Sequence, residues 1–261
     1  MAKLSVIAAV LLSSAAWPAV AAPTPAPAPA STPAPAPGVD IETIKQQNAL
    51  AIKENALITQ VNAATAAKKW QEALDGLTKL IALEPRWDFY QGLGSAQLNL
   101  GQYNEALEAF DKGIAGALAD KTTPADKLKL ARASMLTNKG KLLIKLKRND
   151  EAIAAFTSAA ALDPHPATAY INLCDAQFGL GNAPAAVNAC DKAIKADSTM
   201  VDAYFIKGAA LFANSTMDKN GMLVAPPAAV EALNKYLKLA PNGAHAADVK
   251  EMLDALKTPA K

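Results

Sequence analysis

The sequence is poor in aromatic residues, in cysteine and in histidine, and each shortage limits what the chain can be. Only 5% of its 261 residues are aromatic, whereas 51% are hydrophobic, and alanine supplies much of that fraction. A core of small side chains suits closely packed helices better than a sheet. Valine, isoleucine and threonine also form no alternating runs of the kind that predicts strands. The composition therefore predicts an all-α fold.

Neither sign of charge dominates, and the residues that usually carry chemistry are scarce. The formal net charge is +2 at pH 7 with both signs interspersed, whereas a nucleic-acid-binding face needs clustered basic residues. His165 and His245 are isolated and form no metal-ligand cluster. The sequence contains neither a glycine-rich phosphate loop nor a Gly-x-Ser-x-Gly nucleophile turn. We therefore expect no nucleic acid, metal or cofactor to bind, and we predict that the protein is not an enzyme.

The amino terminus has the three parts of a secretory signal peptide. Lys3 gives a short positive start, an apolar run follows over residues 4–12, and Ala-Val-Ala at residues 19–21 is the small-x-small pattern that signal peptidase cuts. We predict a signal peptide over residues 1–21 and an exported protein, periplasmic or secreted. An apolar run this short cannot span about 30 Å of hydrocarbon, so we expect no transmembrane segment after cleavage.

Residues 22–38 form a linker in which alanine and proline alternate. This composition favours an extended polyproline II conformation. The linker is either a spacer that holds the folded part away from a wall or membrane, or a passive tail left after processing. Both interpretations stay open.

The rest of the chain contains an internal repeat, marked by an alanine early in a helix. The marker alanines are 33, 46, 34 and 43 residues apart, which a 34-residue unit with two insertions explains. Other positions repeat in the same register. The markers are Ala73, Ala106, Ala152, Ala186 and Ala229.

These units resemble the tetratricopeptide repeat family, whose consensus places small, bulky and proline residues at fixed positions of a helix pair. In the second unit the matching residues are Tyr90, Leu93, Gly94, Gly101, Tyr103, Ala106 and Phe110. In the third unit they are Leu136, Gly140, Ala152, Phe156, Ala159 and Pro164. Five units in one register make the resemblance specific.

The resemblance implies a right-handed α-solenoid of about five helix pairs over residues 54–243, because a single pair cannot cover its own apolar face. Residues 39–53 extend the first helix, and the resulting long helix is expected to cover the first end of the stack. Residues 244–261 are expected to form a capping helix and a tail. The expected pairs are 54–86, 87–120, 121–166, 167–200 and 201–243.

Two insertions interrupt the repeat register, at about residues 116–121 and 214–224. The first precedes Thr123-Pro124, an N-cap and first-turn proline, so the next helix is expected to begin near Pro124. The second separates the two helices of the fifth pair and is too long for a tight turn. Long inserted loops are often functional and often merely tolerated, and the sequence leaves both interpretations open.

The repeat register also places the only two cysteines. Cys174 falls in the first helix of the fourth pair and Cys190 in its second helix, at positions that face each other in the family. Export would preserve a bond between them, so we expect a structural disulfide, with two buried thiols as the alternative. A catalytic redox pair is not expected, because that chemistry usually uses Cys-x-x-Cys.

In this family the first helices of the pairs line a concave groove that binds protein segments. The resemblance implies a partner-binding surface that is polar in the first units and more apolar and aromatic in the last. For Phe178 the alternative is packing between neighbouring pairs. The expected surface residues are Ile58, Asn62, Gln91, Ser95, Lys141, Ile171, Asp175, Phe178 and Phe205.

Two functions remain open at this point. The favoured one is an exported scaffold or adaptor that binds a protein or peptide through the groove, and the alternative is an accessory subunit of an envelope enzyme or transport complex. The clamp with which chaperone-binding members grip a terminal carboxylate is not matched, because Gly92 stands at one of its positions. An extended or helical protein segment is therefore the expected ligand, and the sequence does not identify it.

Overall fold

A computed structural model describes residues 41–257. The predicted signal peptide (1–21), the linker (22–38) and the last residues of the predicted tail (258–261) lie outside the described residues. Within the described range the chain is helical apart from one short hairpin, so the all-α prediction is confirmed. None of the helices between residues 41 and 257 combines the length and the apolar character needed to cross a membrane.

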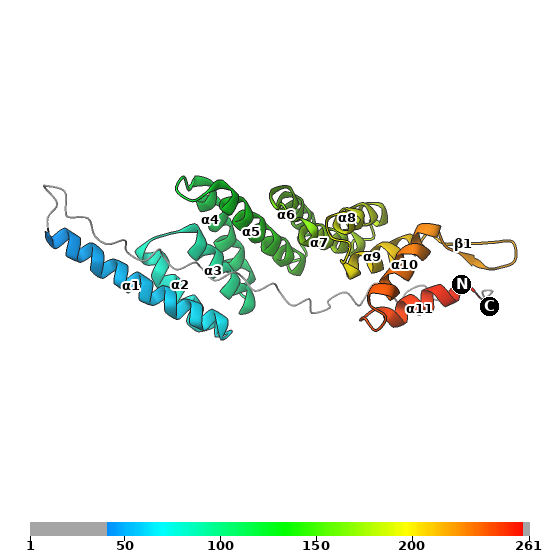
Figure 1. Ribbon diagram of the computed structural model, residues 1–261, viewed down its shortest axis with the longest axis horizontal. Helices are drawn as coiled ribbons and strands as arrows, with labels where there is room; N and C mark the ends of the chain where they lie inside the picture. Colours follow the sequence, from blue (N-terminus) through cyan, green and yellow to red (C-terminus); the bar gives the residue numbers. More distant parts are fainter. Residues whose placement is uncertain (1–40, 258–261) are drawn as a thin grey trace. The chain divides into compact units, whose positions relative to one another are not determined.

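The helices follow one another in pairs (Figure 1). The first helices of the pairs are α1 (Ile41–Ala66), α3 (Trp87–Asn99), α5 (Ala125–Lys145), α7 (Ala167–Gly179) and α9 (Val201–Phe212). The second helices are α2 (Trp70–Leu83), α4 (Tyr103–Ala119), α6 (Asn149–Leu162), α8 (Ala183–Ala196) and α10 (Pro227–Leu239). Strands β1 (Thr216–Met217) and β2 (Leu223–Val224) lie between α9 and α10, and α11 (Ala246–Ala255) follows.

The described residues divide into two compact units, and the boundary falls inside α5. The amino-terminal unit, residues 41–138, contains α1 to α4 and the first part of α5; the carboxy-terminal unit, residues 139–257, contains the remainder. Within each unit consecutive helices pack against each other, as α1 does on α2 and α9 on α10. Such sequential packing of helix pairs is the arrangement of an α-solenoid.

The turn between the two helices of a pair has the same backbone geometry in four of the five pairs. One residue takes a left-handed conformation, and the next N–H donates to the carbonyl five residues earlier, as Gln102 does to Gln97 at 2.9 Å. This is the Schellman motif that ends many helices. The left-handed residues are as far apart as the marker alanines, so the sequence repeat is also a structural repeat. They are Lys68, Gly101, Lys147 and Gly181, with φ of 56°, 78°, 59° and 75°.

The core is built from the residues that define the repeat. All five marker alanines are fully buried. The rings of Phe110 and Phe156 occupy equivalent places and lie against Gly94 and Gly140 of the preceding first helix, where an added Cβ would come within 2.8 and 2.5 Å of them. The first helix therefore needs a small residue at this position, because an aromatic ring fills the space.

The first insertion forms an ordered turn around Asp120. Its carboxylate accepts hydrogen bonds from the backbone N–H groups of Thr122 and Thr123 and from the Trp87 indole, at 2.7, 3.1 and 2.9 Å. Hydrogen bonds from Thr123 and Thr122 hold the pKa of Asp120 far below its usual range. The following helix, α5, begins at Ala125, next to the predicted start.

The second insertion forms the β1–β2 hairpin in place of the tight turn of the other pairs. Thr216 pairs with Val224 and Met217 with Leu223. The Asp218 carboxylate accepts hydrogen bonds from two backbone N–H groups of the hairpin loop, both at 2.8 Å. The insertion is therefore an ordered arm rather than an unstructured loop.

Candidate functional site

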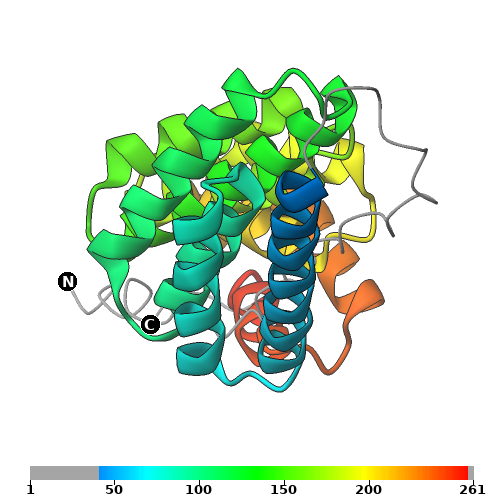
Figure 2. The same ribbon diagram turned by 90° about the vertical axis from the view of Figure 1, so that its left-hand side faces the viewer.

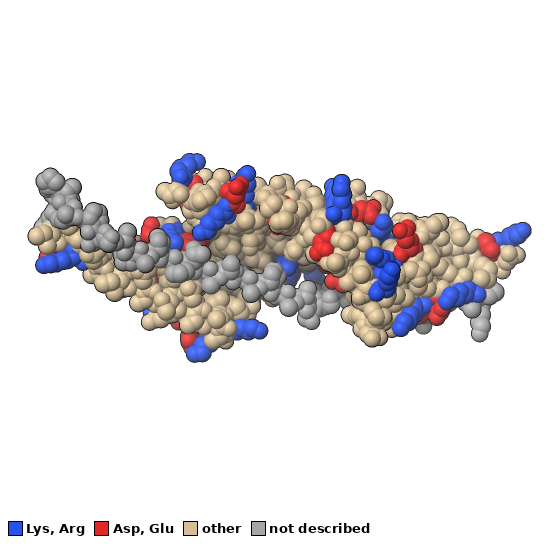
Figure 3. Space-filling view, viewed as in Figure 1, with Lys and Arg blue, Asp and Glu red and all other residues tan. Residues whose placement is uncertain are grey.

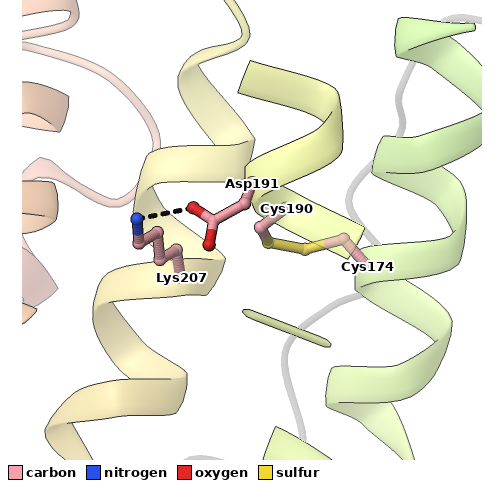
Figure 4. Close-up of a disulfide and its surroundings, with 4 residues drawn as sticks. All are labelled: Cys174, Cys190, Asp191 and Lys207. Carbon is pink, nitrogen blue, oxygen red and sulfur yellow. Dashed lines mark hydrogen bonds and ion pairs between the residues drawn. A yellow bond between two sulfur atoms is a disulfide. The ribbon is translucent and has the colours of Figure 1, made fainter. Parts of the chain in front are cut away.

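A disulfide between Cys174 and Cys190 joins α7 to α8 (Figure 4). Both residues are fully buried, and their Cα atoms are 5.1 Å apart. In the repeat register the two cysteines occupy the places of Gly94 and Phe110, so a covalent bond fills the space that a glycine–phenylalanine contact fills in other pairs. The bond predicted from the register is thus present in the structure, and its burial indicates a structural role.

An ion pair continues this connection from α8 to α9. Asp191, the neighbour of Cys190, accepts a hydrogen bond of 2.6 Å from the Lys207 ammonium group of α9 (Figure 4). The first helices α7 and α9 also contact each other directly. The disulfide and the ion pair therefore connect α7 to α9 through the second helix α8.

In the amino-terminal unit, two of the predicted surface residues are buried, and these predictions are wrong. Ile58 is 1% exposed and belongs to a core cluster with Leu77 of α2 and Phe89 of α3, because its side of α1 packs toward those helices. Ser95 is also buried, and its hydroxyl donates to the Gln91 carbonyl within α3 at 2.9 Å. Neither side chain is accessible to a partner.

The other two predicted residues of this unit are partly exposed. Asn62 lies on α1 and Gln91 on α3. The Gln91 side-chain amide donates to the Ser134 hydroxyl of α5 at 3.5 Å, which places α3 and the first part of α5 beside each other at this surface. Both residues stay candidates for partner contact.

In the carboxy-terminal unit the prediction for Phe205 is wrong. Its ring is buried and stacks on the His245 ring, with centroids 3.9 Å apart and planes 3° apart. The ring of Tyr236 lies 5.9 Å away, and its hydroxyl accepts a hydrogen bond from the His245 backbone N–H at 2.9 Å. The residue is covered because the chain returns across α9 where α11 begins.

The remaining predicted residues of this unit lie on α5 and α7 and stay accessible. Lys141 is partly exposed and Asp175 is exposed. Ile171 and Phe178 are also partly exposed, and the buried side of each packs against the core cluster of Cys174 and Phe205, as the alternative for Phe178 expected. Burial lowers the pKa of Lys141. The Nδ2 atom of Asn172, the neighbour of Ile171, is buried and has no hydrogen-bond partner among the described residues.

Two carboxylates give this surface its electrostatic character. Asp175 of α7 lies close to Asp202 of α9, and desolvation by the surrounding protein together with the negative charge of Asp202 raises the pKa of Asp175 to about 6. Asp175 is still exposed to solvent on one side. The desolvation therefore comes from neighbouring protein atoms and not from complete burial. Within residues 41–257 neither carboxylate forms an ion pair with a lysine, arginine or histidine.

The side chains on the surface of α7 and α9 are suited to binding a ligand. This surface combines two like charges with half-buried Ile171 and Phe178. No cluster of three or more histidine, cysteine, aspartate or glutamate side chains that could hold a metal occurs in the described part of the chain. Elsewhere charges of both signs are interspersed over the face drawn in Figure 3.

An apolar surface on α1 and α2 was not predicted. Ala-Leu pairs at residues 49–50 and 56–57 recur at a seven-residue spacing, a signal that was available in the sequence. Leu50 is 48% exposed and Ile52 is 71% exposed. The expectation that residues 41–66 cover the first end of the stack is therefore incomplete, because α1 itself leaves apolar side chains open.

Comparisons with solved structures give the fold. MamA (residues 41 to the end) of Desulfovibrio magneticus RS-1 is 22% identical, covers 74% of this chain and 97% of its own, and has a TM-score of 0.58. YrrB is 18% identical with coverage of 81% and 98%, and Pseudomonas aeruginosa PilF is 16% identical with coverage of 80% and 89%; each has a TM-score of 0.58. At these identities the likeness shows a common fold.

Comparisons of sequence give the family. A search of curated proteins finds no match. Three family models, each described as a tetratricopeptide repeat, match residues 88–115, 143–204 and 175–244. They fall on the second to fifth helix pairs, each of which has a buried marker alanine. The chain therefore belongs to the tetratricopeptide repeat family.

Proposed function

We propose that the protein is an exported scaffold or adaptor that binds a protein or peptide segment through the first helices of its carboxy-terminal unit. Tetratricopeptide repeats are typically scaffold modules without enzymatic activity. The similar protein YrrB is described as a tetratricopeptide repeat protein with an unusual peptide-binding site. The fold alone does not fix a function, whereas the surface of α7 and α9 has features that favour a particular ligand.

The observation that carries the proposal is the carboxylate pair of Asp175 and Asp202. Desolvation by the surrounding protein, together with the like charge of Asp202 on the neighbouring first helix, raises the pKa of Asp175 to about 6, which means that its ionised form is disfavoured in the folded protein at neutral pH. A lysine or arginine side chain of a ligand would relieve this repulsion. Half-buried Ile171 and Phe178 would contact apolar residues beside that cation. The segment that fits is therefore basic with apolar neighbours.

Export is supported by two features that do not depend on each other. The first 21 residues have the pattern of a signal peptide. Cys174 and Cys190 form a disulfide, a bond that persists mainly in oxidising compartments. Cell fractionation with amino-terminal sequencing tests this part: we expect a mature chain that begins near Ala22 outside the cytoplasm. An intact Met1 in the cytosol would contradict it.

Binding is tested with a random peptide library displayed on phage and selected on the purified protein. We expect enrichment of peptides with lysine or arginine beside apolar residues. The double variant Asp175→Asn/Asp202→Asn should bind these peptides at least about tenfold more weakly, since one lost charged contact costs roughly 1.5–3 kcal/mol. Glu231→Gln, which removes an exposed carboxylate from the second helix α10, is the matched control and should bind normally. Selection without any basic preference would contradict the proposal.

A further inference from the structure

The outer side of the α1–α2 pair carries an apolar groove that no helix of residues 41–138 fills. Figure 2 shows the two helices side by side, joined by the turn after α1. The groove runs along both helices and is floored by Ala56, Leu57, Ala63 and Ala64 of α1 and by Gly76, Ala82 and Leu83 of α2. Its lining is almost entirely apolar at the end near Leu83.

The groove lies on the side of α2 that faces away from α3. Leu77 of α2 contacts Gly92 of α3 and belongs to the buried cluster, whereas Gly76, Lys79 and Leu83 line the groove. Most residues that line the groove are therefore different from those that pack the pair onto α3, and only Leu57 and Ala64 of the lining also contact the buried cluster. The apolar stripe of α1 also continues beyond the groove through Leu50, because Leu50 and Leu57 are seven residues apart and share one face of the helix.

The seven-residue spacing of apolar residues on α1 indicates which kind of structure can bind in the groove. Ala-Leu at residues 49–50 and at 56–57, followed by Ala-Ala at 63–64, places small and larger apolar side chains in alternation along one stripe. Heptad spacing is the pattern with which one helix packs lengthwise on another. Small residues allow the two backbones to approach closely. The natural occupant is therefore a helix that lies along α1 and α2.

The charges at the rim indicate the chemistry of that helix. Lys53 and Lys79 border the most apolar part of the groove, and within residues 41–257 neither forms an ion pair. The acidic residues of the lining lie at the other end of the groove: Glu72 pairs with Lys69 at 3.0 Å, and Asp75 accepts a hydrogen bond from the uncharged Gln71 amide at 2.9 Å. Beside the apolar floor near Leu83 the charged residues are the two lysines, so the charge there is positive.

We propose that this groove binds an amphipathic helix of another protein whose apolar stripe is flanked by acidic residues. The apolar stripe lies on the alanine and leucine floor, and the flanking carboxylates pair with Lys53 and Lys79. A second copy of this chain fits less well, because a two-fold interface brings the same surface patch against itself. That arrangement sets the cations of one copy against those of the other. The site is separate from Asp175 and Asp202 and does not depend on the proposed function.

Two designed helical peptides test the proposal by fluorescence anisotropy. Both carry the same leucine–alanine heptad stripe, and they are flanked by glutamate in one peptide and by lysine in the other. We expect the protein to bind the glutamate-flanked peptide at least about tenfold more tightly. The double variant Lys53→Glu/Lys79→Glu should reverse that preference. Lys195→Glu, which reverses one charge on an exposed residue of α8, should leave it unchanged.

A second variant examines the floor of the groove. Ala56→Glu replaces an exposed residue of α1 with a good helix former, so the helix content and melting temperature should stay close to those of the wild type while peptide binding is lost. Binding that survives Ala56→Glu, or that is equal for the two peptides, would overturn the proposal. So would the absence of binding to either peptide. A dimer in sedimentation analysis that Ala56→Glu dissociates would assign the groove to a second copy and also overturn it.

Discussion

The first and the last helix pair of this protein present their outer sides differently. At the carboxy-terminal pair, α11 packs on α10 and buries Ala246 and Val249, and His245 stacks on Phe205 of α9. At the amino-terminal pair, no described helix of the same unit occupies the outer groove of α1 and α2, and its apolar floor stays open. Solenoids need polar or covered ends for solubility. An end that is apolar and open is therefore better explained as a place where a partner packs.

One substitution at each end tests whether the two ends are packed differently, because equivalent ends should lose equal stability. Phe205→Ala should destabilise the protein by about 3 kcal/mol, because it leaves a cavity beneath His245 and Tyr236. Leu57→Ala should cost only about 1 kcal/mol, because Leu57 is already partly exposed on the groove. Thermal unfolding followed by circular dichroism measures both. Equal losses would mean that the two ends are packed alike.

Reduction of the disulfide should have the next largest effect. Cys174 and Cys190 are 16 residues apart, and a loop of about 15 residues gains about 3 kcal/mol in the chain-entropy model. Reduction should therefore lower the melting temperature, with little loss of helix content at room temperature. Intact mass before and after alkylation reports the redox state. Two thiols that react freely in denatured, non-reduced protein would contradict the assigned bond.

Much of this architecture could be predicted because the same residue types recur at the same positions of each helix pair. The marker alanines and the residues at the places of Cys174 and Cys190 are set by contacts within one pair, and these recur with the sequence. The surface residues were less predictable. Ile58 and Phe205 occupy family groove positions, yet each is buried by local packing at an end of the repeats. Ile58 packs toward α2 and α3, and Phe205 is covered by His245, just before α11. End effects do not repeat, so the register could not reveal them. Ser95 of the second pair is not at an end, and its burial within α3 is a separate local effect.

The helix-pair turns allow the two units to be compared with one substitution in each. Lys68 and Lys147 adopt the left-handed conformation that glycine adopts in the turns at Gly101 and Gly181. Because a residue with a Cβ is strained there by roughly 1 kcal/mol, Lys68→Gly and Lys147→Gly should each raise the free energy of unfolding by somewhat less than 1 kcal/mol. Chemical denaturation measures the change. A loss of stability in either variant would show that its lysine has another role.

The smallest expected effect concerns Asp175 and depends on pH. Because the pKa of Asp175 is raised from its usual 3.8 to about 6 in the folded protein, the folded protein binds more protons than the unfolded chain between these values. Stability contributed by this group therefore falls as the pH rises through that window. Asp175→Asn should be more stable than the wild type by about 0.5–1 kcal/mol at pH 7.5, allowing for solvent screening. The difference should vanish near pH 4, and a difference independent of pH would contradict the assignment.

The most direct test of the central claim is to locate the contact between this protein and its partner. A photo-crosslinking amino acid would replace Ile171 on the first helix α7 in one variant and Lys195 on the second helix α8 in another, and both would be irradiated in intact cells. If the first helices of the carboxy-terminal unit form the binding surface, a specific crosslinked partner should appear from position 171 and not from position 195. A partner captured only from position 195 would contradict the account.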